Sequence, residues 1–537
     1  MNRKFYLPKF YCCLTLFIIA CSTKTQSPYS NSVIATAHPL ATEAGKKMFA
    51  LGGNAFDAAI AAAFTLSVVE PSMSGIGGRL QAIYQSADGN ISGVDATTEV
   101  PMNYKKTDQK FNYGYPTIGI PGVVAGLIKL HQEQGSLPLN ELMAPSIELA
   151  EEGFEILPGE ALRQASVVDQ LREFEGTRQH FFTSDSNTVK SGERLIQKDL
   201  AQVLKKIAAE GHKGFYEGDI AEKMVADIQK NGGVLTLEDL KNYTARRSRI
   251  LEGTYKGYNI YSPFLPSYGA ITIQILQILD HLSPIQSEEE WTQQLGKVTE
   301  IAYNYRDFQK NEDSLENILS YEKAAQWAKQ IETNKVELSE LFNQSNPIPL
   351  SWTSIDGHTT HLTAADQWGN SIALTQTVGP TMGSKVATKG LGFIYAVTLG
   401  GYLGSYRPGD RVNSHISPTL VKTPEGKVQI ALGAAGGSRI ITAITQVLSR
   451  YIGQKLPLEQ AMLLPRVYPY EDSLWIENHS EIDKLNANFD SNTFPVKYID
   501  EIAKFGRVHA VAKDPNAEAW IGAADPDWEG TTASYEK

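Results

Sequence analysis

The stretch that decides the fold of this chain reads Asp356-Gly357-His358-Thr359-Thr360-His361-Leu362-Thr363-Ala364-Ala365-Asp366, then Gln367-Trp368-Gly369-Asn370, then Ser371 to Thr377. Two runs of roughly alternating small or apolar and polar residues flank the Gly-Asn pair, which tolerates positive φ. This pattern predicts a β-hairpin. Its first strand opens with two threonines, just after a flexible Asp-Gly step.

The first of these threonines, Thr359, is a candidate nucleophile. A threonine hydroxyl reacts poorly unless a base lies beside it. Cleavage of the chain before Thr359 would supply that base, because the freed α-amine has a reference pKa of about 8. From these residues alone, a β-branched pair that opens an ordinary strand is the simpler interpretation.

Length and composition describe a large globular protein. The 537 residues are too many for one simple core, so we expect one large domain or two closely fused domains. Of the residues, 42% are hydrophobic and 20% are charged, and the formal net charge is −11. This acidic balance argues against nucleic acid as a partner and against a basic membrane-surface role.

The cysteines and histidines exclude several kinds of site. All three cysteines, Cys12, Cys13 and Cys21, precede Ser22. The rest of the sequence therefore has no disulfide, no thiolate nucleophile and no cysteine metal site. The ten histidines show no ligand spacing, so we expect no metal and no cofactor.

The first residues have the pattern of a targeting segment. Arg3, Lys4 and Lys9 precede an apolar run, Phe10 to Ala20, that is too short to span a bilayer. The run ends in Ile18-Ile19-Ala20-Cys21-Ser22, which resembles a bacterial lipoprotein signal. We therefore expect residues 1–21 to be a signal peptide ending at a lipidated Cys21, and residues 22–32 to be a polar tether. The protein would then be exported and anchored to a membrane, on the periplasmic side or at the cell surface of a bacterium. A plain secretory signal cut elsewhere is the alternative.

From Val33 onward, helical and strand patterns alternate. Thr42 can cap a helix that stops at Gly52-Gly53, and Asn54 can cap a helix from Ala55 to Val69. The region from Glu288 to Leu341 is helical and heavily charged, which is typical of a solvated face. Further helices are expected at Leu142–Glu152, Leu200–Glu210, Asp219–Asn231, Leu237–Asn242, Ile271–His281 and Ile440–Tyr451, and strands at Leu80–Tyr84, Ile91–Asp95, Tyr258–Tyr261, Thr419–Lys422 and Gln429–Gly433.

A glycine pair separates the last of these strands from its helix. Gly436 and Gly437 present free backbone N–H groups at the positive end of the helix, and an oxyanion hole is commonly built in this way. A tight strand-to-helix turn without a ligand explains the same residues.

Six motifs together resemble the γ-glutamyltranspeptidase (glutathione hydrolase) family of N-terminal-nucleophile hydrolases, over nearly the whole mature chain. They are Gly52-Gly53-Asn54-Ala55-Phe56-Asp57-Ala58-Ala59, Gly119-Ile120-Pro121-Gly122, Gly232-Gly233-Val234-Leu235-Thr236, Thr359-Thr360-His361, Ser417-Pro418-Thr419 and Gly436-Gly437-Ser438-Arg439. The resemblance implies an α/β fold, a four-layer αββα sandwich.

The resemblance also implies catalytic roles. Thr359 matches the nucleophile, and the precursor would cut itself between His358 and Thr359. A large subunit, 33–358, and a small subunit, 359–537, would then stay together. Thr377 matches a second threonine that hydrogen-bonds the nucleophile, and Gly436 and Gly437 match the oxyanion-hole pair.

The implied substrate pocket departs from the family. The family holds the α-carboxylate of the γ-glutamyl group with an arginine and two serines, and the α-amine with an asparagine, a glutamine or glutamate, and an aspartate. Here small uncharged residues stand at most of these positions, which suggests a neutral or bulkier acyl group. The substrate-contact positions are Thr97 for the arginine, Gly379 for the asparagine, Thr398 and Gly401 within the segment Ala396-Val397-Thr398-Leu399-Gly400-Gly401 that replaces the acidic one, and Ser414 and His415 for the serine pair.

Three functions fit the sequence. The first is a membrane-tethered, self-processing threonine amidohydrolase or acyltransferase that acts on a small amide or peptide with an acyl group other than γ-glutamyl. The second is a true γ-glutamyltransferase that acts on glutathione. The third is a non-catalytic surface lipoprotein, against which Thr359, Thr377 and the glycine pair argue.

Cys21→Ser tests the proposed anchor. The substitution removes the thiol that would carry the lipid, so we expect the protein to move from the membrane fraction to the soluble fraction. Immunoblots of both fractions measure this, with Cys12→Ser as the matched control. Equal membrane association of Cys21→Ser and the wild type would show that something else holds the protein.

Overall fold

The computed structural model describes residues 29–183, 187–306, 312–333, 358–401, 404–470, 473–479 and 495–536. The predicted signal peptide, which includes Cys21, lies outside these ranges. So do residues 22–28 of the predicted tether and residues 334–357, which directly precede His358. The strand β1 begins at Asn31, two residues before the predicted start of the compact chain. No helix among the described residues is both long enough and apolar enough to span a bilayer.

Two antiparallel sheets form the centre of the molecule. The larger sheet has, in spatial order, β18 (Thr531–Glu536), β1 (Asn31–Thr36), β9 (Thr360–Ala365), β10 (Ser371–Thr377), β2 (Arg79–Gln85), β3 (Ile91–Ala96) and β6 (Arg246–Arg247). The smaller sheet has β17 (Trp520–Ala524), β16 (Arg507–Lys513), β12 (Val428–Ala435), β11 (Thr419–Lys422), β8 (Tyr258–Pro263) and β7 (Ile250–Tyr255).

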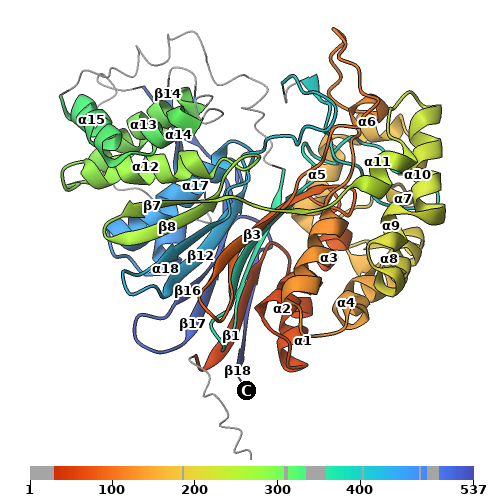
Figure 1. The fold of residues 1–537 in the computed structure, drawn as a ribbon, viewed down its shortest axis with the longest axis horizontal. Coiled ribbons are helices and arrows are strands. Elements are labelled where there is room, and N and C mark those ends of the chain that lie inside the picture. Colours follow the sequence, from red (N-terminus) through yellow and green to blue (C-terminus); the bar gives the residue numbers. More distant parts are fainter. Residues whose placement is uncertain are drawn as a thin grey trace, which may run out of the picture.

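Helices cover the outer face of each sheet (Figure 1). Against the larger sheet and beyond it lie α1 (Pro39–Ala50), α2 (Ala55–Val69), α3 (Val123–Gln134), α4 (Leu139–Glu152), α5 (Pro158–Ser166), α6 (Val168–Arg172), α7 (Glu175–Phe181), α8 (Lys198–Glu210), α9 (Lys213–Tyr216), α10 (Gly218–Lys230) and α11 (Leu237–Asn242). On the side of the smaller sheet lie α12 (Gly269–His281), α13 (Glu288–Asn304), α14 (Glu312–Ile318), α15 (Tyr321–Glu332), α17 (Arg439–Leu448) and α18 (Leu458–Leu463). The layer order is helix, sheet, sheet, helix, so the predicted αββα sandwich is confirmed.

Residues that are close together in the sequence set the start of the helix α2. Asn54 caps it, as the sequence predicts, by accepting hydrogen bonds from two backbone N–H groups. Asp57 adds a capping box that was not predicted. The helix α1, in contrast, begins at Pro39 and not after Thr42. The cap is the ring of His38, which accepts from the N–H of Leu40, and a proline suits the first helical position.

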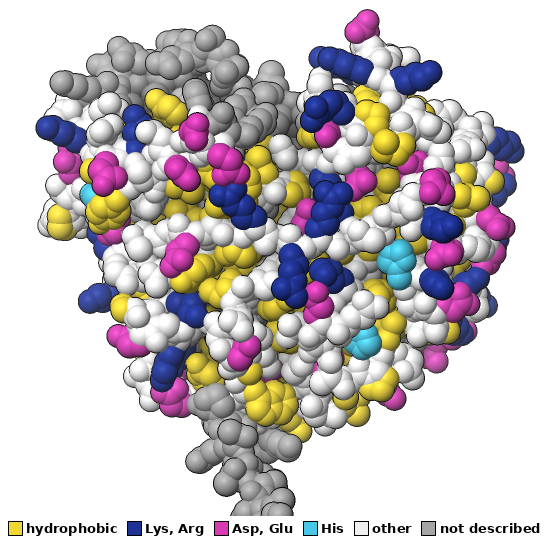
Figure 2. Space-filling model, in the orientation of Figure 1, with side chains coloured by type: hydrophobic (Ala, Val, Ile, Leu, Met, Phe, Trp, Pro, Cys, Tyr) yellow, Lys and Arg dark blue, Asp and Glu magenta, His cyan; other side chains and the backbone are white. Residues whose placement is uncertain are grey.

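The charged region after Glu288 was expected to be a solvated face, and this was wrong. The helices α13 and α15 bury Trp291, Leu295 and Trp327 against the smaller sheet's helical layer. Most of their charged residues lie on the outer sides, although Glu300 of α13 is buried. On the face that Figure 2 shows, acidic and basic side chains are interspersed, and this mixed surface is unlike the basic patch that nucleic acid requires.

The predicted hairpin is the centre of the larger sheet. The strands β9 and β10 pair antiparallel from Thr360↔Gln376 to Ala365↔Ser371, and β1 and β2 flank them. Asp366 holds the turn. Its Oδ1 accepts the N–H groups of Trp368 (2.9 Å) and Asn370 (3.0 Å). Its Oδ2 accepts the Ala55 N–H (2.8 Å), which ties the turn to the first residue of α2.

The two sheets come into close contact where Gly433 of β12 faces His361 of β9. A Cβ atom added at Gly433 would lie 2.7 Å from Nδ1 of the His361 ring. The ring is held between two hydroxyls, those of Thr375 (2.7 Å) and Thr363 (2.8 Å). Burial lowers the pKa of His361 to about 3, so the ring is neutral and acts as part of the core.

We expect Gly433→Ala to destabilise the protein, because the new methyl group collides with His361. The expected loss in free energy of unfolding is about 1–3 kcal/mol, measured by urea denaturation of the uncut Thr359→Ala chain. In a His361→Ala background, Gly433→Ala should lower the free energy of unfolding by much less. Equal costs in both backgrounds would show that the sheets do not depend on this contact.

Candidate active site

Thr359 lies directly before β9, at the end of the sheet where β10 finishes with Thr377. The structure is that of the uncut chain. The hydroxyl of Thr359 donates to the carbonyl oxygen of His358, the residue before it. The Thr377 hydroxyl donates to the same oxygen (2.9 Å), and it accepts the N–H of Gly379 (2.9 Å). Two hydroxyls therefore converge on the carbonyl at the predicted cut.

This arrangement polarises the peptide bond before Thr359. Attack of the Thr359 hydroxyl on the His358 carbonyl would place negative charge on the oxygen that Thr377 already contacts. A donor aimed at a developing oxyanion is commonly worth about 2.7–4 kcal/mol. Gly379, expected as a substrate contact, supports Thr377 through its backbone N–H, and its φ of +95° favours glycine at this position.

The imidazole of His358 is neutral. Burial lowers its pKa well below the ordinary value, and the charges of Lys385, Arg163 and Arg507 lower it further. The Thr381 hydroxyl lies 2.7 Å from Nδ1 of this ring. The side chain on the acyl side of the cut is thus held by Thr381, and it carries no charge.

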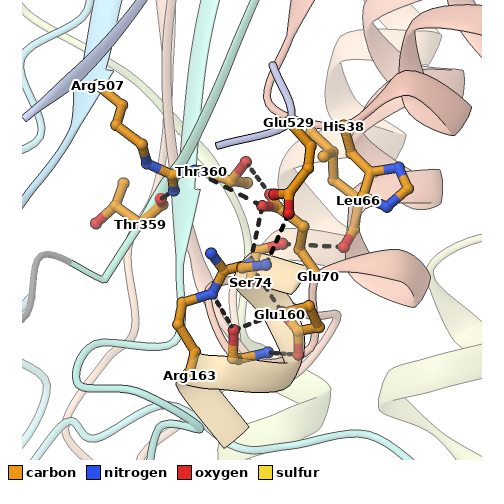
Figure 3. Close-up of polar contacts among 12 residues, drawn as sticks. His38, Leu66, Glu70, Ser74, Glu160, Arg163, Thr359, Thr360, Arg507 and Glu529 are labelled. Carbon is orange, nitrogen blue, oxygen red and sulfur yellow. Dashed lines mark hydrogen bonds and ion pairs between the residues drawn. The ribbon is translucent and has the colours of Figure 1, made fainter. Parts of the chain in front are cut away.

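A buried ion cluster lies behind Thr360, on the side of the helices (Figure 3). The Thr360 hydroxyl donates to Oε2 of Glu70 (2.6 Å), and Arg163 pairs with Glu70 (3.4 Å) and Glu160 (3.0 Å). Burial raises the pKa of Glu70, although Arg507, Arg163 and the Thr360 hydroxyl favour its charged form. The cluster anchors the residue after the nucleophile.

Arg507 brings a cation to Thr359 from the smaller sheet. Its Nη2 donates to the Thr359 carbonyl oxygen (3.4 Å). The indole of Trp528 contacts both buried arginines, with Arg163 4.3 Å and Arg507 4.5 Å from the ring centre. Neighbouring positive charge disfavours protonation of an amine. The Arg507 charge would therefore favour the neutral form of a freed α-amine on Thr359, which is the form that a general base needs.

Gly436 and Gly437 follow β12 directly. The last residue of that strand, Ala435, pairs with Arg507, whose guanidinium reaches Thr359. The glycine pair therefore lies at the same end of the sandwich as the nucleophile. Both have positive φ, +138° and +60°, and α17 begins two residues later. The positions agree with an oxyanion hole at a helix start.

Thr97 does not present its hydroxyl as a free contact. It is fully buried, and its Oγ1 accepts from Nε2 of Gln81 (2.6 Å). Asp95 joins the same group by accepting from Gln81 (2.8 Å) and from the Thr97 N–H (3.0 Å). The other Asp95 oxygen pairs with Arg411 (3.0 Å).

The other predicted contacts are spread around this end of the molecule. Thr398 is buried and donates its N–H to Thr117, whereas Gly401 lies against residues 110–111. The backbone N–H of Ser414 donates a hydrogen bond to the carbonyl oxygen of Pro266. His415 stacks between Tyr268 and Tyr303, with ring centres 5.2 and 6.2 Å away. Burial and the charge of Arg306 lower the pKa of His415 to about 3, so the His415 ring is neutral.

Sequence reasoning missed the charged residues of this site. Glu70, Arg163 and Arg507 come from three distant segments, and no local pattern distinguishes them from surface charges. It also missed Arg79, the first residue of β2, which lies directly opposite Thr377. Only the pairing of β2 with β10 shows this position.

A family comparison identifies the chain. The sequence model described as gamma-glutamyltranspeptidase matches residues 41–535. This chain belongs to the gamma-glutamyltranspeptidase family. It is similar to the glutathione hydrolase proenzyme of Pseudomonas sp. (strain A14), with 30% identity over 520 residues, 89% of this chain and 87% of that protein.

Two further relatives carry other names. The capsule biosynthesis protein CapD proenzyme of Bacillus anthracis is 30% identical over 512 residues, 93% of this chain and 90% of that protein. The crystal structure of a cephalosporin acylase from Bacillus halodurans has a TM-score of 0.83 and 23% identity, covering 95% of this chain and 96% of that one, and it supports the fold. Family membership makes this protein an amide-cleaving enzyme of the N-terminal-nucleophile type.

One cluster in this family member has the composition of a metal site. The ligand atoms of Glu477, His479 and Asp527 lie within 4.8 Å of one another. Burial lowers the pKa of His479, but its contacts with Asp527 and Glu477 outweigh burial and raise the pKa to about 10. The protonated ring therefore already balances the carboxylates, with Arg466 beside them (3.9 Å from Glu477). A metal would have to displace that proton.

Thr377→Val tests the hydroxyl that contacts the His358 carbonyl. Valine keeps the shape and removes the donor, so self-cleavage should slow by about 100- to 1000-fold. The measurement is the appearance of the two fragments on a denaturing gel over time.

Thr375→Val is the matched control. Thr375 lies on the same strand and the same face, but its hydroxyl contacts His361. We expect its cleavage rate to stay within about threefold of the wild type. Equal slowing in both variants, or normal cleavage in Thr377→Val, would contradict the assigned role of Thr377.

Proposed function

We propose that this protein is a membrane-tethered, self-cleaving threonine amidohydrolase or acyltransferase whose acyl group is not γ-glutamyl. The observation that carries the proposal is the convergence of the Thr359 and Thr377 hydroxyls on the His358 carbonyl. The names of two relatives as proenzymes support the same processing. The lipoprotein-like sequence that ends at Cys21 supports the tether.

Self-cleavage would proceed by an acyl shift from nitrogen to oxygen. The Oγ1 of Thr359 attacks the His358 carbonyl carbon, the amide C–N bond breaks, and the Thr359 nitrogen gains a proton. Water then hydrolyses the resulting ester. The products are a carboxylate on His358 and a free α-amine and hydroxyl on Thr359.

Catalysis would use the same atoms again. The α-amine of Thr359 takes the proton of Oγ1 as this oxygen attacks the substrate's amide carbonyl. The N–H groups of Gly436 and Gly437 stabilise the oxyanion, and the leaving amine receives the proton. Water or an acceptor amine then removes the acyl group from Thr359, which gives hydrolysis or transfer.

The altered specificity rests on the residues that would face the α-amine. A buried ammonium group needs a carboxylate or several polar partners. The segment from Ala396 to Gly401 has neither an acidic residue nor an amide side chain, and Gly379 has no side chain. Asp95 is already paired with Arg411. A γ-glutamyl group would therefore bind with its ammonium poorly compensated.

We expect very slow release of 4-nitroaniline from γ-glutamyl-4-nitroanilide by the fully processed enzyme. Each missing charged contact is worth about 1.5–3 kcal/mol, so kcat/KM should be at least about 100-fold below that of a glutathione hydrolase measured in parallel. The Thr359→Ala protein serves as the blank. Efficient turnover that Thr359→Ala abolishes would instead support a true γ-glutamyltransferase.

A further inference from the structure

Trp528 lies in the loop between β17 and β18, beside Arg163 and Arg507. Its backbone has a φ of +63°, a left-handed conformation that is strained for a bulky residue. The side chain is half-buried, and its indole N–H has no hydrogen-bond partner among the described residues. Strained residues persist only where their surroundings hold them, and they gather at functional sites. The contacts of this loop therefore show what the strain supports.

Three acidic side chains at alternate positions hold the loop. Asp525 accepts a backbone N–H of β16 (2.7 Å). Asp527 pairs with His479 (3.1 Å). Glu529 accepts the N–H of the second residue of α5 (2.7 Å). The loop is thus fixed both to the smaller sheet and to the helices on the side of the larger sheet, which leaves the Trp528 backbone little freedom to relax.

The Trp528 ring contacts two buried cations at once. The guanidinium carbon of Arg163 lies 4.3 Å from the ring centre, and that of Arg507 lies 4.5 Å from it. The Nη1 atoms of both arginines have no hydrogen-bond partner among the described residues. An aromatic ring attracts a cation, and it does so more strongly when the pair is shielded from water. The indole therefore stabilises both charges where hydrogen bonds do not.

Arg507 depends on the ring more than Arg163 does. Arg163 also donates to the Ser72 hydroxyl (2.7 Å) and pairs with two carboxylates, at 3.0 and 3.4 Å. For Arg507, the described residues supply a long hydrogen bond to the Thr359 carbonyl oxygen (3.4 Å) and an ion pair of 4.0 Å with Glu70. Loss of the indole would therefore release Arg507 first. Arg507 is also the cation that reaches the nucleophile.

Charged and titratable groups from several elements lie around Thr359 and its contacts. After the cut, cations favour the neutral form of the Thr359 α-amine, and carboxylates favour its ammonium form. Among the described residues, the charged side chain that hydrogen-bonds Thr359 is that of Arg507. The cut itself adds a carboxylate on His358, which is common to every variant below. The other groups are the cations Arg163, Lys385 and Lys504, the carboxylates Glu70, Glu160, Asp525 and Glu529, and the neutral imidazoles of His358, His361 and His509.

We propose that Trp528 is a positioning residue for the catalytic base. Its indole holds the Arg507 guanidinium at Thr359, so that the freed α-amine of Thr359 stays neutral and can accept the proton of its own hydroxyl. Trp528 acts through Arg507 and not on the reacting atoms. The proposal rests on the proposed function of Thr359 as the nucleophile.

The pKa of the Thr359 α-amine tests this role without a known substrate. Brief treatment of the processed protein with acetic anhydride at a series of pH values acetylates the neutral amine, and hydroxylamine then removes acetyl esters. Mass spectrometry of the tryptic peptide 359–385 gives the rate at each pH. We expect the wild-type amine to have a pKa below its reference value of about 8. A wild-type pKa at or above about 8 would overturn the proposal without any variant.

Trp528→Leu removes the ring and keeps an apolar side chain. We expect the pKa of the amine to rise, because a released and hydrated Arg507 acts on it less. The acetylation rate should fall by at least about threefold near pH 6 and stay unchanged near pH 9. Trp528→Phe keeps an aromatic face, and its rates should stay within about 1.5-fold of the wild type. An equal fall at every pH would show altered access to the amine and would overturn the proposal.

A second substitution shows whether Trp528 acts through Arg507. In an Arg507→Met background the cation is absent, so Trp528→Leu should change the rate near pH 6 by less than about 1.5-fold. A threefold fall in both backgrounds would overturn the proposal.

Trp475→Leu is the matched control. Trp475 also has a cation over its ring, Lys497 at 5.2 Å, but it packs in a separate apolar cluster. We expect no change in the acetylation of Thr359. A fall as large as that of Trp528→Leu would mean that the position of the indole does not matter, and this would overturn the proposal.

The same samples separate the role of Trp528 from the proposed function. Self-cleavage uses the hydroxyls of Thr359 and Thr377, so Trp528→Leu should still give a chain that begins at Thr359. Loss of the cut in this variant would mean that Trp528 holds the fold and not the charge, and would overturn the proposal. If the wild type gives no chain that begins at Thr359, the proposed function fails and the role of Trp528 falls with it. If that chain appears and its amine does not respond to Trp528→Leu, the Trp528 proposal alone fails.

Discussion

The hydrogen bond from the Thr377 hydroxyl to the His358 carbonyl is the contact on which the rest of the site depends (2.9 Å). It exists because β9 and β10 pair in one register, and a slip of one residue would turn both threonines to the other face. The turn at Asp366 fixes that register from the far end of the hairpin, with a bond to the start of α2. A tight turn at the far end of six paired positions therefore controls the geometry of the cut.

The two sheets contribute different parts of the chemistry. The larger sheet places Thr359 and Thr377 at the cut, and the smaller sheet brings Arg507 and the glycine pair after β12 to the same end. Close approach of the sheets at Gly433 and His361 brings these parts together. Because Arg507 brings positive charge to Thr359, the site favours a neutral amine there after the cut.

Features that depend on neighbouring residues in the chain could be predicted from the sequence. The hairpin, the capped helix α2 and the glycine pair each depend on residues that are close in the chain, and all were placed correctly as elements. Long-range contacts could not be read in this way. Glu70 and Arg163 meet Thr360 from more than 190 residues away, and the burial of Trp291 under charged neighbours depends on the neighbouring helices. The position of Arg79 opposite Thr377 likewise follows only from the pairing of β2 with β10.

The central claim is that Thr359, with its own α-amine as base, carries the acyl group. Rapid quenching of the processed enzyme during turnover of an amide substrate, followed by tandem mass spectrometry of the small subunit, tests it most directly. We predict a chain that begins at Thr359, with the substrate's acyl group as an ester on the Thr359 oxygen and an α-amine that still reacts with an amine-labelling reagent. An acyl group on any other residue, or a chain that begins elsewhere, would contradict the account.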